Sequence, residues 1–120
     1  MRIALAQLNF TVGAFDANFA RMEQAVARAR EAAADLVVFS ELAATGYPPR
    51  DLLLRAGFID ANLALVDRLA ALSDDRLGIV AGFVDRNPRA EGKDLCNAVA
   101  VCHGGRVIAR RHKCLLPTYD

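Results

Sequence analysis

The sequence predicts an α/β domain whose helices cover one face of a sheet. Short apolar runs at residues 3–6 and 36–39 are typical of buried strands. Apolar residues between these runs recur at spacings of three and four, which indicates an amphipathic helix. Two strand-like runs flank Gly104-Gly105, a pair that tolerates the positive φ angles of a tight hairpin turn. The expected order is strand, helix, strand, helix, strand and hairpin.

The first strand and helix are predicted from residues 3 to 35. Residues 3–6 form the strand, and residues 11–13 supply the break that follows it. Asp16 can cap the helix at its N-terminus, and Asp35 ends it. The apolar stripe expected to pack into the core is Phe19, Met22, Val26, Ala29 and Ala33.

The second strand and helix follow. Residues 36–39 are apolar throughout, so this strand is expected to be covered on both faces. Tyr47-Pro48-Pro49 is predicted to be a rigid loop, because each proline lacks an N–H donor and restricts the residue before it. Helical spacing resumes near Asp51, with an expected break near Gly57. Its apolar positions are Phe58, Ile59, Leu63, Val66 and Ala70.

A third strand and the hairpin complete the predicted sheet. Residues 77–84 form the strand, and the polar residues 87–93 form an exposed loop. In an ideal two-residue hairpin, residues at equal distances from the turn face each other. The expected pairs are His103 with Arg106, Cys102 with Val107, and Cys96 with Lys113.

Composition bounds the class of protein. The 120 residues are 54% hydrophobic and 24% charged, which favours one globular domain over a disordered segment. Lys and Arg total 15 against 14 Asp and Glu, so no net field would recruit nucleic acid or an acidic membrane. The apolar stretches are far shorter than the ~20 residues that span a bilayer. The N-terminus lacks the features of a signal peptide, which predicts a cytoplasmic protein.

The three cysteines, Cys96, Cys102 and Cys114, form no CxxC pair, and their odd number argues against a disulfide framework. Their spacing gives no support for a zinc site either, so no metal is expected. Cys114 adjoins Lys113, but neighbouring strand residues point to opposite faces, so the two side chains should not converge on one carbonyl. None of the three cysteines is assigned to catalysis, because buried structural thiols are commoner than reactive ones.

Glu41 lies just beyond the carboxyl end of the second strand, on the rim where α/β sheets commonly place ligand sites. One interpretation is a solvated acid at a strand end. The other is a general base, whose pKa would be raised by partial burial at the mouth of the strand. Position alone leaves both interpretations open.

Lys113 ends the second hairpin strand, after Arg110, Arg111 and His112. One interpretation of this positive run is a solvated strand edge that discourages strand-to-strand aggregation. The other is that Lys113 stabilises an oxyanion, because a fixed ammonium in a poorly hydrated pocket favours a tetrahedral intermediate.

Three stretches together resemble the nitrilase, or carbon-nitrogen hydrolase, superfamily: AQLNFTVG, DLVVFSELAATGYPPRDLLL and GGRVIARRHKCLLPTYD. The GYPPRDLLL segment looks most like the glutaminase domains of glutamine-dependent NAD synthetases. The resemblance covers nearly the whole chain and implies an αββα sandwich, of which residues 1–120 are about the first half of a single domain. It also implies a Glu-Lys-Cys triad in which Glu41 is the general base and Lys113 stabilises the oxyanion. The same resemblance implies that Tyr47 and Tyr119 line the glutamine pocket.

Two departures from the family pattern matter. Ser40 stands where the family usually has proline, a change that leaves Glu41 in place. The family's nucleophilic cysteine lies downstream of the lysine motif, beyond Asp120, so the isolated chain is expected to be inactive. The resemblance further implies that ammonia passes to a separate synthetase domain, absent here, which uses ATP and magnesium to amidate deamido-NAD. The usual assembly of the family suggests a homo-oligomer.

Two alternatives remain open at this stage. A carbamoylase or aliphatic amidase of the same superfamily would share Glu41 and Lys113. A non-catalytic interaction domain is the other, because half of a sandwich would leave one apolar face of its sheet uncovered.

Overall fold

The computed structural model describes residues 1–89 and 91–114 and confirms the predicted order of elements. Its strands and helices are β1 (Ile3–Ala6), α1 (Phe15–Glu31), β2 (Leu36–Phe39), the 3₁₀ helix η1 (Arg50–Leu54), α2 (Ala56–Ala70), β3 (Gly78–Arg86), β4 (Leu95–His103) and β5 (Arg106–His112).

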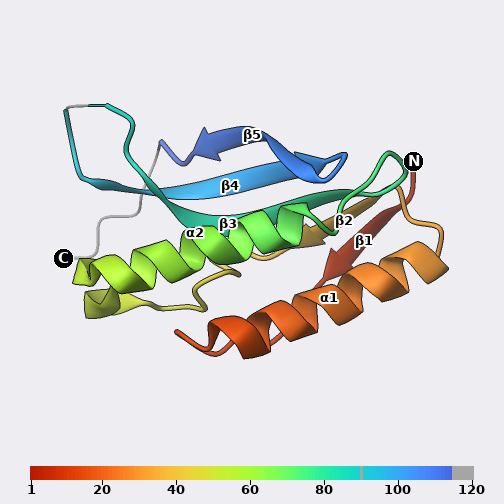
Figure 1. Ribbon diagram of the computed structural model, residues 1–120, viewed down its shortest axis with the longest axis horizontal. Coiled ribbons are helices and arrows are strands. Elements are labelled where there is room, and N and C mark those ends of the chain that lie inside the picture. Colours follow the sequence, from red (N-terminus) through yellow and green to blue (C-terminus); the bar gives the residue numbers. More distant parts are fainter. Residues whose placement is uncertain (90, 115–120) are drawn as a thin grey trace.

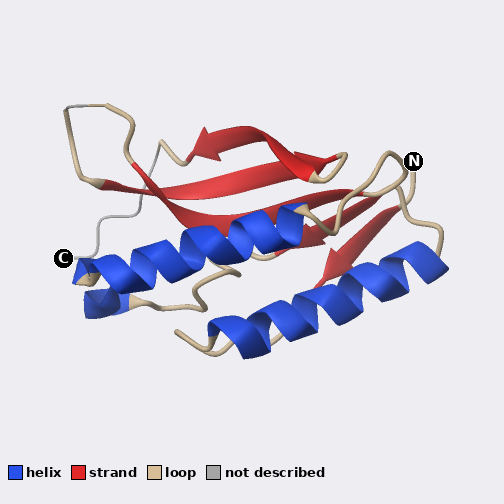
Figure 2. Cartoon of the chain, in the orientation of Figure 1, coloured by secondary structure: helices blue, strands red, loops and turns tan. Residues whose placement is uncertain are grey.

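The five strands form one sheet in the order β1-β2-β3-β4-β5. The first three strands are parallel, and β4 and β5 add to β3 as antiparallel neighbours. Parallel neighbours need a crossover connection, which α1 supplies between β1 and β2 and α2 supplies between β2 and β3. Both helices lie on the same face of the sheet (Figures 1 and 2), as the sequence predicts.

The core lies between this helical layer and the sheet. Its largest fully buried apolar side chains come from both helices and from β3, and include Met22, Leu65, Leu69, Ile79 and Phe83. The two helices also contact each other through Arg68, which pairs with Asp16 at 2.9 Å and stacks 4.0 Å from the ring centre of Phe19. Burial of this apolar layer is the main stabilising contribution to the fold.

The opposite face of the sheet, called here the open face, is not covered within the described residues. One row of apolar side chains crosses it in register, from Leu5 through Val38 and Val80 to Val101. Leu5 is 74% exposed, and the three valines are half-buried. The prediction that β2 is covered on both faces is therefore wrong for the described part of the chain.

Two details of α1 differ from prediction. Ala14, not Asp16, precedes the helix, and no side chain caps it; Asp16 lies in the first turn, where its charge still complements the helix dipole. The helix ends at Glu31, before Asp35, because Ala33 adopts a left-handed conformation with φ of 50°. Ala33 is exposed and does not belong to the buried stripe.

In the second half of the chain, the boundaries of the elements lie closer to the predicted ones. The proline segment is a loop, as predicted, and contains a cis Tyr47-Pro48 bond. The break before α2 falls at Arg55, which is extended, and not at Gly57. The third strand begins one residue later than predicted and runs two residues further, to Arg86.

The hairpin turn at Gly104-Gly105 is confirmed, with φ angles of 59° and 77°. The pairs of His103 with Arg106 and Cys102 with Val107 are also confirmed. The third predicted pair is wrong, because Val101 pairs with Ala109 and leaves Ile108 as an extra residue in β5. This β-bulge shifts the register by one residue.

After the bulge, Asn97 rather than Cys96 lies opposite Lys113. The Lys113 N–H donates to the backbone oxygen of Asn97 over 2.8 Å. Because a one-residue shift exchanges the two faces of a strand, the bulge decides which β4 side chain accompanies Lys113.

Candidate active site

Glu41 is held on a tight turn that packs against β3. The Ala44 N–H donates to the Gly82 oxygen over 3.1 Å, and Leu42 adopts a left-handed conformation with φ of 51°. Gly82 permits this close approach, because a Cβ at that position would lie 2.5 Å from the Leu42 nitrogen and 2.7 Å from the Ser40 oxygen. A glycine on β3 therefore fixes where the glutamate turn sits.

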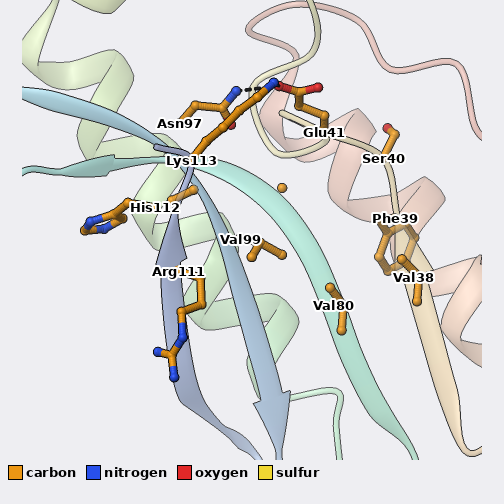
Figure 3. Close-up of a pocket in the computed structure, with 12 residues that line it drawn as sticks. Val38, Phe39, Ser40, Glu41, Val80, Asn97, Val99, Arg111, His112 and Lys113 are labelled. Carbon is orange, nitrogen blue, oxygen red and sulfur yellow. Dashed lines mark hydrogen bonds and ion pairs between the residues drawn. The ribbon is translucent and has the colours of Figure 1, made fainter. Parts of the chain in front are cut away.

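Glu41 and Lys113 meet although 72 positions separate them in the sequence. Lys113 Nζ lies 2.9 Å from Glu41 Oε1, and Asn97 Nδ2 donates to the same oxygen over 2.5 Å. Figure 3 shows the three side chains converging at one end of the sheet, from the turn after β2, from β4 and from the residue after β5. Sequence reasoning predicted the first two residues and missed Asn97.

These contacts set the charge state of Glu41. The hydrogen bond from Lys113, followed by that from Asn97, lowers the pKa of the Glu41 carboxyl below its ordinary value, and burial opposes this only weakly. The expectation of a pKa raised by burial is therefore wrong, because the side chain is 55% exposed and has two donors. Glu41 is ionised at neutral pH and can accept a proton.

A cavity of about 390 Å³ opens beside this cluster on the open face. Val38, Val80 and Val99 form its apolar floor, and Glu41 and Lys113 stand at its polar end (Figure 3). An apolar floor with a few convergent polar groups is typical of small-molecule sites. This arrangement suits a small substrate whose polar group is presented to the carboxylate and the ammonium.

A second polar cluster lies on the helical side of the same strands. Asp85 is 5% exposed and accepts hydrogen bonds from Arg110 and His112, each over 3.0 Å. His112 points to the other side of β5 from Lys113 (Figure 3). One interpretation of this basic run was a solvated strand edge, but the side chains of Arg110 and His112 are paired inward with a carboxylate from β3. Nothing local in the sequence reveals that pairing.

Of the two predicted substrate-binding tyrosines, the structure describes one, and that one does not line the cavity. Tyr47 is 64% exposed in the loop before η1 and is not among the residues that line the cavity. Tyr119 lies outside the described residues.

The cysteines fit structural rather than catalytic roles where the structure describes them. Cys102 is fully buried, and burial raises the pKa of its thiol to about 11, so the nucleophilic thiolate is scarce. Cys96 shares the helical face of β4 with Cys102, and the exposed Cys114 directs Sγ at the His112 oxygen over 3.6 Å. Across residues 1–89 and 91–114, no three His, Cys, Asp or Glu side chains gather as a metal site. No helix in those residues is long and apolar enough to cross a membrane.

Comparison with known proteins places the chain in a family. A model of the carbon-nitrogen hydrolase family matches residues 2–120. The chain belongs to the carbon-nitrogen hydrolase family. The predicted relation to the amino-terminal part of such a domain in NAD synthetases is supported by a relative from Synechocystis, named glutamine-dependent NAD(+) synthetase. It is 40% identical over 98% of this chain, which spans 22% of the relative's length.

Solved structures of the family share the fold. The glutamine-dependent NAD⁺ synthetase of Acinetobacter baumannii, solved with ADP, superposes with a TM-score of 0.86 at 32% identity. The match covers 98% of this chain and 22% of that one. A nitrilase-superfamily amidase from Nesterenkonia, in a Glu-to-Gln variant carrying acrylamide at its active-site cysteine, superposes with a TM-score of 0.79 at 25% identity, over 99% of this chain and 46% of that one. The nitrilase-like α/β fold predicted from sequence is confirmed.

Proposed function

We propose that Glu41 and Lys113 are the general base and the oxyanion-stabilising cation of a site that hydrolyses the side-chain amide of glutamine. The observation that carries this proposal is the 2.9 Å contact between Lys113 Nζ and Glu41 Oε1 at the polar end of a cavity. The resemblance to the nitrilase superfamily implies such a pair, and an amidase with the same fold has an active-site cysteine and has been solved as a Glu-to-Gln variant.

The proposed reaction has two stages. Glu41 takes the proton of a cysteine thiol, and the thiolate attacks the amide carbon while Lys113 stabilises the negative oxygen of the tetrahedral intermediate. Glu41 returns the proton to the leaving nitrogen, so that ammonia departs and a thioester remains. Glu41 then takes a proton from water, the hydroxide attacks the thioester, and glutamate and the thiol are released.

The remaining parts of the activity lie outside residues 1–120. The nucleophilic cysteine belongs to later sequence of the same glutaminase domain, of which these residues form a single partial unit. Ammonia then passes to a synthetase domain that amidates deamido-NAD with ATP and magnesium. Tyr47 and Tyr119 contact the glutamine substrate once the domain is complete. The full-length protein is a cytoplasmic homo-oligomer.

The test measures ammonia release from glutamine by the full-length protein that carries this sequence. Glu41→Gln and Lys113→Met should each reduce kcat about 10²-fold or more, because each removes a group that acts in the transition state. The matched controls are Glu23→Gln on the exposed side of α1 and Lys93→Met in the exposed loop. Full activity in Glu41→Gln or Lys113→Met would exclude the assigned roles.

A substrate panel separates glutaminase from the related amidase and carbamoylase activities. Glutamine should give a higher kcat/KM than aliphatic amides or N-carbamoyl compounds. The purified 120-residue chain should release no ammonia from any of them, because its two groups cannot replace a nucleophile. Release that depends on Glu41 and Lys113 in this chain would contradict the assignment.

A further inference from the structure

The side-chain amide of Asn97 completes the contacts of Glu41. Its Nδ2 donates to Oε1 over 2.5 Å, and Lys113 Nζ donates to that same oxygen over 2.9 Å. Within the described part of the chain, Oε2 accepts no hydrogen bond. The two donors therefore occupy one oxygen of the carboxylate and leave the other available.

Asn97 is anchored by the sheet on both sides. It lies in β4 with a backbone partner on each side, Val84 on β3 and Lys113 after β5. A residue flanked by strands on both sides presents its side chain from a fixed point, which is the property a support for a reactive group needs. The amide can therefore hold the Glu41 carboxylate from a fixed position.

The chemistry of the two donors differs in a way that matters here. An ammonium is a compact charge with rotatable donors and can approach either oxygen of a carboxylate. An amide N–H has a direction fixed by its plane, and the group stays neutral at every pH of interest. The orientation of the carboxylate thus depends on Asn97 more than on Lys113.

We infer that Asn97 is a positioning residue that holds Glu41 with Oε1 toward Lys113 and leaves Oε2 as the oxygen that accepts the proton. This inference rests on the proposed role of Glu41 as general base. Asn97 also lines the cavity, and its proposed effect on the reaction comes through its hydrogen bond to Glu41. Removing its donor should alter both the titration and the orientation of the carboxylate.

The first test follows the Glu41 carboxyl by ¹³C NMR in the chain labelled at its glutamate carboxyl carbons. The sequence has four glutamates, at positions 23, 31, 41 and 91, and the signal lost in Glu41→Gln identifies the one at 41. Asn97→Leu keeps the approximate size of the side chain but removes the hydrogen-bond donor. The titration midpoint of the Glu41 carboxyl should then move to higher pH, because a donor to its ionised form is gone. The matched control, Asn9→Leu at an exposed position, should leave that midpoint unchanged.

A second variant covers the case in which Asn97→Leu does not fold. Asn97→Asp keeps the shape of the side chain and places a carboxylate where the amide stood, so the Glu41 midpoint should rise through repulsion between like charges. An unchanged midpoint in the folded variant, equal to that of wild type and of Asn9→Leu, overturns the inference.

The second test uses the full-length protein with glutamine. In Asn97→Leu, kcat should fall about tenfold with KM changed less than about twofold, and the acid limb of kcat/KM should move to higher pH. A merely structural role would not move that limb. An active protein whose Asn97→Leu variant keeps the wild-type limb and kcat overturns the inference. A wild-type protein that releases no ammonia from glutamine overturns the proposed function instead, whichever way the carboxyl titrates.

Discussion

At the scale of single residues, the charge of Glu41 links the site to pH. Because Lys113 and Asn97 lower the pKa of this carboxyl, the folded state binds its proton less tightly than the unfolded chain does. The resulting stabilisation is fully present above the ordinary pKa of a glutamate, about 4.3, and is lost as pH falls through the lowered value. Neutral solutions therefore keep the full contribution, and acid solutions remove it.

The free energy of unfolding of Glu41→Gln should therefore differ from wild type in a pH-dependent way. At pH 7 the variant should be less stable by about 0.2–1 kcal/mol, the range for exposed ion pairs, because both side chains are about half exposed. The difference should shrink as pH falls below the ordinary glutamate pKa of about 4.3 and through the lowered pKa of Glu41. Urea unfolding midpoints measured across this range are the readout, and a difference that stays constant with pH would contradict the expectation.

At the scale of elements, the contact between the turn that carries Glu41 and β3 depends on the lack of a side chain at Gly82. Gly82→Ala should destabilise the fold by about 1–3 kcal/mol, because the new Cβ would clash with backbone atoms of residues 40–42, which have little room to retreat. It should also displace Glu41. The measurements are thermal unfolding and, in the full-length protein, ammonia release.

Gly57→Ala is the matched control for that substitution. It changes a glycine to alanine in the first turn of α2, where a new Cβ meets nothing within 4 Å. Alanine is the better helix former, so this variant should be unchanged or more stable by up to about 1 kcal/mol. If both variants lost the same stability, crowding at Gly82 would not be the cause.

Asp85 of β3 accepts hydrogen bonds from two side chains of β5 near Lys113, those of Arg110 and His112. Asp85→Ala should destabilise the protein by about 1–3 kcal/mol, since it leaves Arg110 and His112 without their acceptor. The control is Asp60→Ala, which breaks an exposed pair with Arg86 and should cost no more than about 1 kcal/mol. Chemical unfolding of both variants gives the comparison. Equal losses of stability would mean that the burial of Asp85 does not increase its contribution to the free energy of unfolding.

At the scale of the whole molecule, the two faces of the sheet differ in coverage. The helices bury one face, whereas the row from Leu5 to Val101 on the open face has no covering layer in the described residues. Exposed apolar surface of this kind favours association. The interaction-domain alternative considered from the sequence draws its support from this feature.

The purified 120-residue chain should therefore self-associate as its concentration rises. Light scattering should give an average mass above the 13.0 kDa of one chain. Leu5→Glu should lower that mass by placing a charge within the open face, whereas Leu54→Glu, at a still more exposed position in η1, should not. A compact monomer at all concentrations would remove the basis for the interaction alternative.

The sequence predicted correctly those parts of the fold that depend on residues close together in the chain. Spacings of three and four located α1 and α2, and Gly104-Gly105 located the hairpin turn. Element ends were predicted less well, because they depend on single backbone conformations such as those of Ala33 and Arg55. The coverage of β2 was misjudged, since an apolar strand is compatible with a covered face or an exposed one.

The sequence by itself determined that Glu41 follows an apolar strand and that Lys113 lies at the end of a hairpin, and its motifs predict a nitrilase-like role for both. Only the tertiary structure decided their partners. The bulge at Ile108 placed Asn97 opposite Lys113, and packing across β4 brought Asp85 to Arg110. Local patterns report the preferences of adjacent residues, whereas register and side-chain pairing depend on strands that meet from distant positions in the chain.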